Sequence, residues 1–299
     1  MLVLTALLGT AVRMPSRIGA PARPLPAAAV VRCKAPFACA AVAAAEAPPP
    51  SLYAPFVERA MAIFNETGSP LRRYPLDAEL LQRESTVGSG ARAQPVRLTV
   101  SAFCTDELRQ IRLAHICGGS LQVLNFCAFP SLAYGLPTFA ADLVTLPGGH
   151  LIALDFAPNR DPATDDAFDP GGALAAVYAR HRSQLPDGGP IPEAAAKYFS
   201  PYFLWSRLPT PESDAVVGDA VLQAFDDYLR AYLDLVRDAM PLEDEAMRGA
   251  VRKAQLSYAR YRAEEDPARP MLTRLFGGDF AERLIHEALF DLPFHLDSE

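Results

Sequence analysis

Strand-like runs dominate the first part of the regular patterning. Apolar residues rich in β-branched and aromatic types cover 96–103, 121–129, 139–146 and 151–156, with turn-forming residues between them. Ahead of these runs, apolar residues recur at helical spacing over 53–65. Short apolar runs bounded by Gly and Pro are typical of strands. We therefore predict one helix followed by a sheet.

The pattern becomes helical after about residue 170. Candidate helices cover 172–184, 215–240, 243–264, 269–276 and 279–289. Strands first and helices afterwards indicate an α+β domain with an antiparallel sheet, and not a doubly wound parallel sheet. Because helices flank the strands on both sides in the sequence, they can cover both faces of the sheet. We predict a single α+β domain, a three-layer α/β/α sandwich with a central antiparallel sheet.

The N-terminal segment differs in composition from the rest. An apolar start at 2–8 leads into a run rich in Ala, Pro and Arg, with five basic residues and no acidic residue before Glu46. These features are typical of transit peptides, and the apolar start also fits a bipartite presequence. The alternative is a disordered, Ala- and Pro-rich N-terminal tail with no targeting function. We expect a plastid-targeting presequence over 1–48, a folded domain over 49–299 and a location in the chloroplast stroma.

The charge balance narrows the class of partner. Removing the five N-terminal basic residues takes the formal charge from −7 to −12. An acidic body argues against nucleic acid as the main partner, because phosphate binding needs a basic surface. No apolar run approaches the roughly 18–20 residues needed to span a bilayer, so we expect no membrane partner. An acidic protein could still dock on Arg72–Arg73, Arg109–Arg112 or Arg252–Lys253.

Motifs for bound metals and redox cofactors are missing from the sequence. The cysteines form no C-x-x-C pair, and the histidines lack metal-ligand spacing. No G-x-G-x-x-G follows a strand-like run, and there is no P-loop. We therefore predict no metal site and no bound redox cofactor.

A glycine pair predicts one hairpin in detail. Gly148–Gly149 separates two strand-like runs, as in tight hairpin turns. With these two residues as the loop, Asp142 lies opposite Asp155 on the same face of the sheet. Two carboxyl groups so near each other do not both ionise readily, so one of them is expected to keep its proton near neutral pH. A protonated carboxyl group is what a proton-donating site needs.

Several ordered motifs carry a resemblance to a known family. The run 136–155, L-P-T-F-A-A-D-L-V-T-L-P-G-G-H-L-I-A-L-D, resembles the central hairpin of the ferredoxin-dependent bilin reductases. The resemblance continues in Q-L-P-D-G-G-P-I-P-E at 184–193 and in Y-F-S-P-Y-F-L-W-S-R-L at 198–208. It ends with Y-R-A-E-E-D-P-A-R at 261–269 and L-F-D-L at 289–292. Together the motifs span most of the chain from about residue 51 to 292.

Within the family, the hairpin and the Q-L-P-x-G-G-P-I-P-E segment look like the phycoerythrobilin-forming subgroup. The phycocyanobilin-forming subgroup usually carries a His seventeen positions before the hairpin Asp, where this sequence has Asn125. Two departures stand out, because the family usually has Gly at the positions of Ala140 and Pro270. The first is expected to narrow a pocket beside Asp142.

The resemblance implies a specific chemistry. A linear tetrapyrrole, here 15,16-dihydrobiliverdin, binds between the sheet and the C-terminal helices. Reduced ferredoxin is the external electron donor and delivers electrons singly, so that the bilin passes through a radical on the way to phycoerythrobilin. The protein supplies protons and shape without a flavin or metal. The enzyme that reduces biliverdin in the preceding step is a further candidate partner, and we expect a monomer.

The resemblance assigns the proton donors to two acidic residues. Asp142 matches the family's central proton-donating Asp, and Asp266 matches its second acid. Each residue type also has an ordinary structural explanation. An Asp in an apolar strand can protect an edge strand from unwanted pairing. An Asp before a Pro, as in Asp266–Pro267, can cap the next helix.

Four further residues are candidate substrate-binding groups. Asn125 could hydrogen-bond a pyrrole or lactam group, and Asp155 could tune Asp142. Arg207 and Arg269 lie inside family motifs and could bind the two bilin propionates. Their alternatives are a half-buried polar residue for Asn125, a strand end for Asp155 and surface ion pairs for the arginines.

Three other functions fit parts of this pattern. The same fold could act on biliverdin, either at its 15,16 bond or to form phycocyanobilin. A non-catalytic bilin carrier would keep the pocket and the arginines but is expected to lack the two acids. An unrelated α+β domain would match the motifs only by accident.

Overall fold

The computed structural model describes residues 51–68, 70–90, 93–159 and 168–292, and the predicted presequence over 1–48 lies outside them. Eight antiparallel strands form one sheet in the order β1-β3-β4-β5-β6-β7-β8, with β2 also paired to β3. The strands are β1 (Arg72–Arg73), β2 (Gln82–Val87), β3 (Gln94–Cys104), β4 (Leu108–Gly118), β5 (Leu121–Pro130), β6 (Thr138–Leu146), β7 (Gly149–Ala157) and β8 (Leu204–Leu208).

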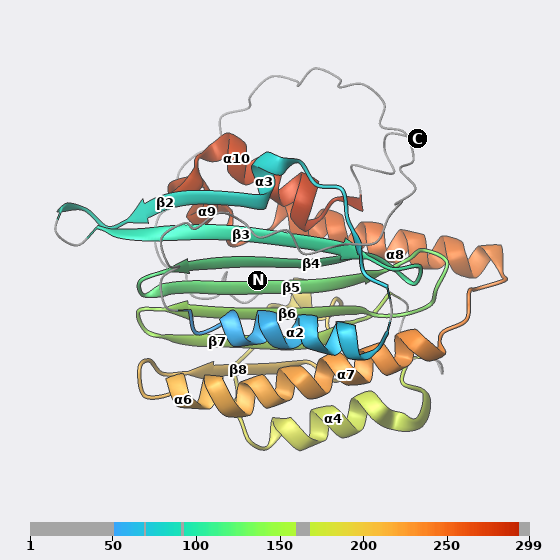
Figure 1. Cartoon of the computed structure of the whole chain (residues 1–299). Helices are drawn as coiled ribbons and strands as arrows, with labels where there is room; N and C mark the ends of the chain where they lie inside the picture. Colours follow the sequence, from blue (N-terminus) through green and yellow to red (C-terminus); the bar gives the residue numbers. More distant parts are fainter. Residues whose placement is uncertain (1–50, 69, 91–92, 160–167, 293–299) are drawn as a thin grey trace.

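Helices cover both faces of this sheet, which confirms the predicted α/β/α sandwich (Figure 1). One face carries α2 (Ala54–Glu66), α4 (Ala173–Arg182), α6 (Asp214–Val216), η3 (Val217–Val221) and α7 (Leu222–Asp238). The other carries α8 (Glu245–Glu264), α9 (Arg269–Phe276), α10 (Gly278–Arg283) and η4 (Leu284–Leu289). Short connections hold α3 (Ala78–Leu81), η2 (Pro170–Gly172) and α5 (Glu193–Ala196).

The face toward α2 and α7 is a buried aromatic core. Phe126, Phe139 and Phe156 project from three neighbouring strands and are fully buried. Phe225 and Tyr228 of α7 meet them, and the Tyr228 ring stacks on Phe156 with 4.9 Å between ring centroids. Burying such a side chain contributes about 1.5–3 kcal/mol. This face therefore anchors the sheet.

Four strands lie outside the predicted runs, namely β1, β2, β4 and β8. β4 carries polar residues among its apolar ones, including Gln110 and Arg112, which break the expected alternation. Both are fully buried, because the sheet and the C-terminal layer surround them. β8 is five residues long and lies within the region expected to be helical, where it pairs with β7 at the sheet edge.

The predicted register of the β6–β7 hairpin is wrong by two residues. Leu146 pairs with Gly149, so Asp142 lies opposite Ala153, and Asp155 lies opposite Ala140. Gly149 is the first residue of strand β7 and not part of the turn. Glycine suits this position, because a Cβ there would lie 2.7 Å from the carbonyl oxygen of Leu208 on β8. A shift of two keeps every side chain on its face. The two acids therefore share a face, as expected, but lie diagonally.

Candidate active site

A row of polar side chains crosses the sheet face that α8 and α9 cover. Arg112 on β4, Asn125 on β5 and Asp142 on β6 follow one another across three adjacent strands. Arg112 donates a hydrogen bond from Nη1 to Asn125 Oδ1, and Asn125 donates from Nδ2 to Asp142 Oδ1. Burial of polar groups is unfavourable unless they are paired, so such a row inside an apolar layer indicates a functional site.

Asp142 lies at the centre of this row. Its strand β6 pairs with β5 on one side and β7 on the other, so protection of an edge strand does not explain it. Arg262 Nη2 of α8 lies 3.4 Å from Asp142 Oδ2, and the Asp142 side chain is 12% exposed. The carboxyl group therefore contacts an amide from the sheet and a guanidinium from the helix layer.

Asp155 is the more deeply buried of the two hairpin acids. Its carboxyl group accepts hydrogen bonds from Ser200, with the backbone N 3.1 Å from Oδ2 and the Oγ 2.5 Å from Oδ1. Burial raises the pKa of Asp155 to about 7, although the Ser200 hydrogen bonds act in the opposite direction. A carboxyl group that keeps its proton near neutral pH is thus present. The raised pKa of Asp155 is caused by burial, and not by the expected repulsion between Asp142 and Asp155.

Asp266 lies between α8 and α9 and is 4% exposed. Its Oδ1 accepts a hydrogen bond from the Ala268 backbone N at 2.8 Å, and the N-cap residue of α9 is Ala268 itself. Its Oδ2 has no hydrogen-bond partner among the described residues. Burial raises the pKa of Asp266, whereas the positive charge of Arg262 lowers it. Asp266 therefore caps a turn with one oxygen and keeps the other available.

Arg262 and Arg112 are site residues that the sequence prediction missed. Arg262 is 6% exposed, contacts Asp142 and acts electrostatically on Asp266. A signal was present, because Arg262 continues the buried positions 251, 255 and 258 of one helix face. Arg112 was missed because its strand β4 was not predicted. Its side chain is fully buried, so it cannot belong to a docking cluster on the surface.

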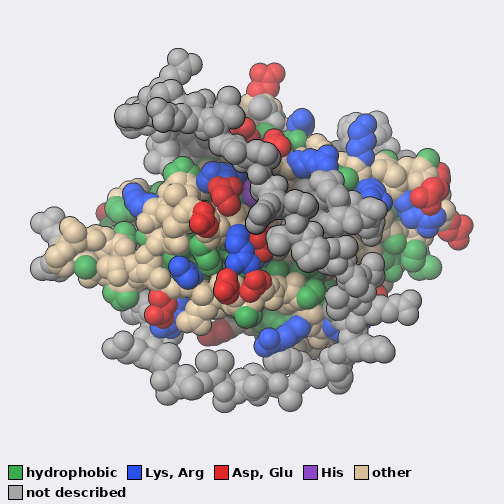
Figure 2. Space-filling view, turned by 90° about the horizontal axis from the view of Figure 1, so that it is seen from above, with side chains coloured by type: hydrophobic (Ala, Val, Ile, Leu, Met, Phe, Trp, Pro, Cys, Tyr) green, Lys and Arg blue, Asp and Glu red, His purple; other side chains and the backbone are tan. Residues whose placement is uncertain are grey.

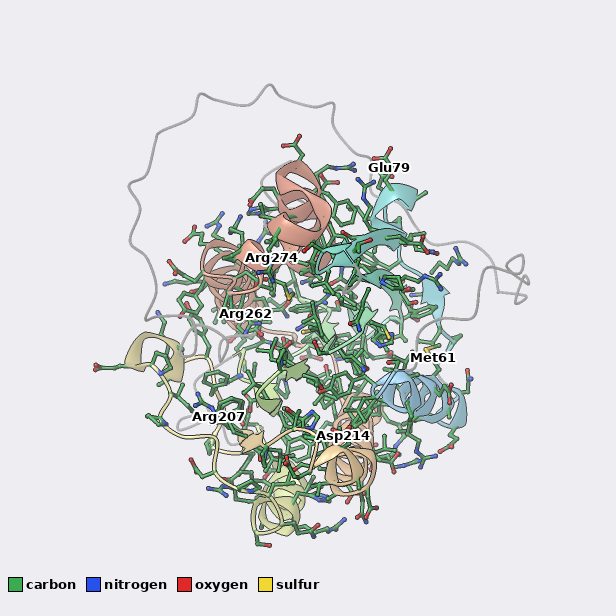
Figure 3. The ribbon with its side chains drawn as sticks, turned by 90° about the vertical axis from the view of Figure 1, so that its left-hand side faces the viewer. Met61, Glu79, Arg207, Asp214, Arg262 and Arg274 are labelled. Atoms are coloured by element: carbon green, nitrogen blue, oxygen red, sulfur yellow. The ribbon has the colours of Figure 1, made fainter. Side chains whose placement is uncertain are left out.

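The two predicted propionate-binding arginines lie outside the polar row. Arg207 is on β8, with its guanidinium 5.3 Å from the centroid of the buried Trp205 ring. Its Nε has no hydrogen-bond partner among the described residues. Arg269 donates hydrogen bonds to Glu282 of α10 and to the Ala263 carbonyl of α8, so it links three helices. Figure 3 labels Arg262 in the helix layer and Arg207 near the β8 edge.

Two small cavities, each about 20 Å³, flank the polar row. Asp142 lines the first and its hydrogen-bond partner Asn125 lines the second, so this pair stands at their boundary. Each cavity has room for about one water molecule. A larger ligand therefore requires the side chains above the sheet to move. Those above the first cavity are Tyr198, Phe199, Phe203, Tyr258 and Arg262.

The described part of the chain carries neither a membrane-spanning helix nor a metal-binding cluster. None of the helices placed there is both long and apolar enough for a membrane span. Likewise, no group of three or more His, Cys, Asp or Glu side chains within 51–292, leaving out its undescribed gaps, is arranged to hold a metal ion.

Comparison with known proteins identifies the family. Residues 60–291 match the family model described as ferredoxin-dependent bilin reductase. The chain is 48% identical to a phycoerythrobilin:ferredoxin oxidoreductase of Nostoc punctiforme over 81% of this chain and 94% of that protein. A relative of the same name from Gloeobacter violaceus is 45% identical over 81% and 96% of the two chains.

A solved structure agrees with these sequence matches. The crystal structure of tomato phytochromobilin synthase in complex with biliverdin superposes with a TM-score of 0.72 at 25% identity, covering 83% of this chain and 85% of that one. The motifs, the sheet with its two helix layers and the matched length agree. This chain is an enzyme that belongs to the ferredoxin-dependent bilin reductases.

Proposed function

We propose that this enzyme reduces 15,16-dihydrobiliverdin to phycoerythrobilin. Two reduced ferredoxins each give one electron, and the protein delivers two protons, so the A-ring diene gains two electrons and two protons. The names of the relatives from Nostoc and Gloeobacter support this product. Asn125, at the position where the phycocyanobilin-forming subgroup usually has a His, supports it further.

The observation that carries the proposal is the polar row between two cavities. A linear tetrapyrrole that filled both cavities would cross the Asn125–Asp142 pair. Its apolar edges would lie against the alanines that line the first cavity and the leucines that line the second. Entry of the bilin would displace Arg262 from Asp142, because the closed cavities have no room for it.

Protons come from Asp142 and Asp266 in this proposal. Electrons arrive singly, so the bilin passes through a radical that gains basicity as it is reduced. A carboxyl group next to it then transfers its proton, which general acid catalysis requires. Burial favours the protonated form of Asp266. Asp155, protonated near neutral pH, donates a hydrogen bond to the substrate.

The arginines bind the propionates in the same scheme. The buried Nε of Arg207 has no hydrogen-bond partner among the described residues. It can therefore donate a hydrogen bond to a carboxylate without breaking an existing contact of that atom. Arg269 would first have to release Glu282. Bidentate pairing of Arg with a carboxylate makes either arginine suitable.

The test is anaerobic turnover with reduced ferredoxin, with 15,16-dihydrobiliverdin and biliverdin supplied separately. Conversion of dihydrobiliverdin alone to phycoerythrobilin is the expected result. Asp142→Asn and Asp266→Asn are expected to lose turnover or to stop at a radical visible by electron paramagnetic resonance. Asp279→Asn is the matched control, because Asp279 lies exposed on α10. Conversion of biliverdin would overturn the proposed substrate, because the enzyme would then act on biliverdin. Tight binding of both bilins without turnover would favour a non-catalytic bilin carrier.

We further propose that residues 1–48 direct the protein to the plastid stroma. The absence of acidic residues before Glu46 supports this. The relatives named above are cyanobacterial, so they bear only on the enzyme domain. A fusion of residues 1–48 to a fluorescent protein is expected to enter plastids of an alga or plant. A cytosolic signal from this fusion would overturn the proposal.

A further inference from the structure

The outer face of α8 forms an open groove that belongs to neither cavity. It has a volume of about 630 Å³, and all but one of its lining residues come from α8. They recur at three- and four-residue spacing, so they form one stripe along the helix. The lining residues are Tyr198, Gly249, Arg252, Lys253, Leu256, Ser257, Arg260, Tyr261 and Glu264.

This groove is positively charged in a protein whose formal charge is −7. Three of its lining residues are basic and one, Glu264, is acidic. Lys197 adds a further positive charge beside it, with its Nζ 4.9 Å from the centroid of the Tyr198 ring. In Figure 2, several Lys and Arg side chains lie at the upper right, with Asp and Glu side chains among them, over the end of the molecule where Figure 1 shows α8. The stripe therefore favours a negatively charged partner.

The three basic clusters that the sequence predicted as docking sites differ in how far their side chains are available to a partner. Arg72 is engaged with Asp106, with 2.7 Å between Nη2 and Oδ1. Arg109 pairs with the buried Asp291 at 2.9 Å. Arg112 is fully buried. Arg252 and Lys253 are exposed on α8, and among the described residues they form no ion pair.

An aromatic connection joins this groove to the candidate active site. Tyr198 lines both the groove and the cavity beside Asp142. Its ring stacks on Tyr261 of the groove with centroids 4.6 Å apart, and it meets Tyr258 of the cavity edge-on at 5.9 Å. A donor seated in the groove would therefore be separated from the cavity by one layer of aromatic side chains.

We infer that the groove on α8 is the docking surface for the electron donor, an acidic ferredoxin whose carboxylates face Arg252 and Lys253. The inference rests on the proposed function, because it takes the cavity beside Asp142 as the site that receives electrons. The donor would bind through charge complementarity and pass single electrons across the Tyr198 layer into the cavity.

The test begins with binding, which needs no turnover. The dissociation constant of an oxidised, acidic [2Fe–2S] ferredoxin is measured by calorimetry for the wild type, Arg252→Glu, Lys253→Glu and Arg274→Glu. Arg274 is the matched control, because it is an exposed arginine on α9 outside the groove and its reversal changes the net charge equally. Circular dichroism confirms that each variant is folded.

We expect Arg252→Glu and Lys253→Glu each to weaken ferredoxin binding by about fivefold or more at low ionic strength, as charge reversal at an interface does. Raising the salt to about 0.5 M should remove most of this difference, because salt screens exposed charges. Arg274→Glu should change the dissociation constant by less than about twofold. Equal effects at all three positions, or no effect at Arg252 and Lys253, would overturn the inference.

Kinetics separate this inference from the proposed function. The KM for ferredoxin should rise in Arg252→Glu, whereas turnover with a small chemical reductant should match the wild type. A wild-type protein that turns over with neither donor would refute the proposed function, and the binding comparison would still decide the docking surface. A loss of turnover with both donors in Arg252→Glu would place this residue in the active site and overturn its docking role.

Discussion

Replacing Asp155 with Asn should change how the stability of the enzyme depends on pH. Asn keeps an oxygen that accepts the Ser200 hydrogen bonds but cannot ionise. In the wild type, burial raises the pKa of Asp155 from its ordinary value of 3.8 to about 7. Between these two pH values the folded state holds a proton that the unfolded state has released. The free energy of unfolding therefore falls as pH rises through this window.

The magnitude follows from the two pKa values. A change from 3.8 to about 7 corresponds to about 4 kcal/mol of stability, present in full below pH 3.8 and lost by the time the pH has passed about 7. Between pH 5 and pH 8, this single group should lower the free energy of unfolding by about 2 to 3 kcal/mol. The Asn variant lacks this contribution, so it should gain that much relative to the wild type across the same interval.

The assay is urea denaturation followed by circular dichroism at pH 5, 6, 7 and 8, at constant ionic strength. Subtracting the control Asp279→Asn, at an exposed position, removes the part of the difference that any replacement of a carboxyl group by an amide would give. Ser200→Ala provides a second check, because the Ser200 hydroxyl group lowers the pKa of Asp155, and its loss should extend the decline to higher pH. A wild-type-minus-Asn difference that stays constant from pH 5 to pH 8 would refute the conclusion that Asp155 is protonated in the folded enzyme.

Three further changes test other parts of the structure. Arg262→Gln removes the charge that lowers the pKa of Asp266, so the alkaline limb of the kcat–pH profile should move to higher pH; a move to lower pH would contradict the assigned contact. Gly188→Ala should destabilise the fold by about 1–3 kcal/mol, because the new Cβ would lie 2.2 Å from the buried Trp205 ring, and an unchanged urea midpoint would argue against this packing. Phe225→Ala should lower the free energy of unfolding by about 3–5 kcal/mol while leaving kcat of the folded fraction intact, and a loss below about 1 kcal/mol would contradict its place in the core.

The sequence predicted the layers well, because apolar periodicity reports burial directly. The helices of both layers and the long strands β3, β5, β6 and β7 lie within a few residues of their expected bounds. β4 was missed for a physical reason. Its buried Gln110 and Arg112 resemble solvent-facing residues in a linear pattern, and only the surrounding layers show that they are enclosed. β8 is too short for periodicity to detect.

The candidate site was predictable in its residue types but not in its contacts. Asp142 stood out as an acid within an apolar strand, and Asp266 as an acid directly before a predicted helix. Both belong to the buried region around Arg262. The hairpin register failed because Gly149 serves close packing against β8 and is not part of the turn. The electrostatic role of Arg262 depends on which face of α8 meets the sheet. That follows from tertiary packing, which local spacing does not specify.

The two faces of the sheet have a consequence for how such enzymes diversify. The aromatic rings that hold α7 to the sheet lie on one side, and the alanines beside Asp142 lie on the other. A mutation at Ala140 or Ala153 can reshape the cavity beside Asp142 without disturbing any ring of that core. Selection can therefore change the shape of the cavity beside Asp142 while the aromatic core is inherited unchanged. One scaffold can in this way give rise to a lineage of enzymes with different pigments as products.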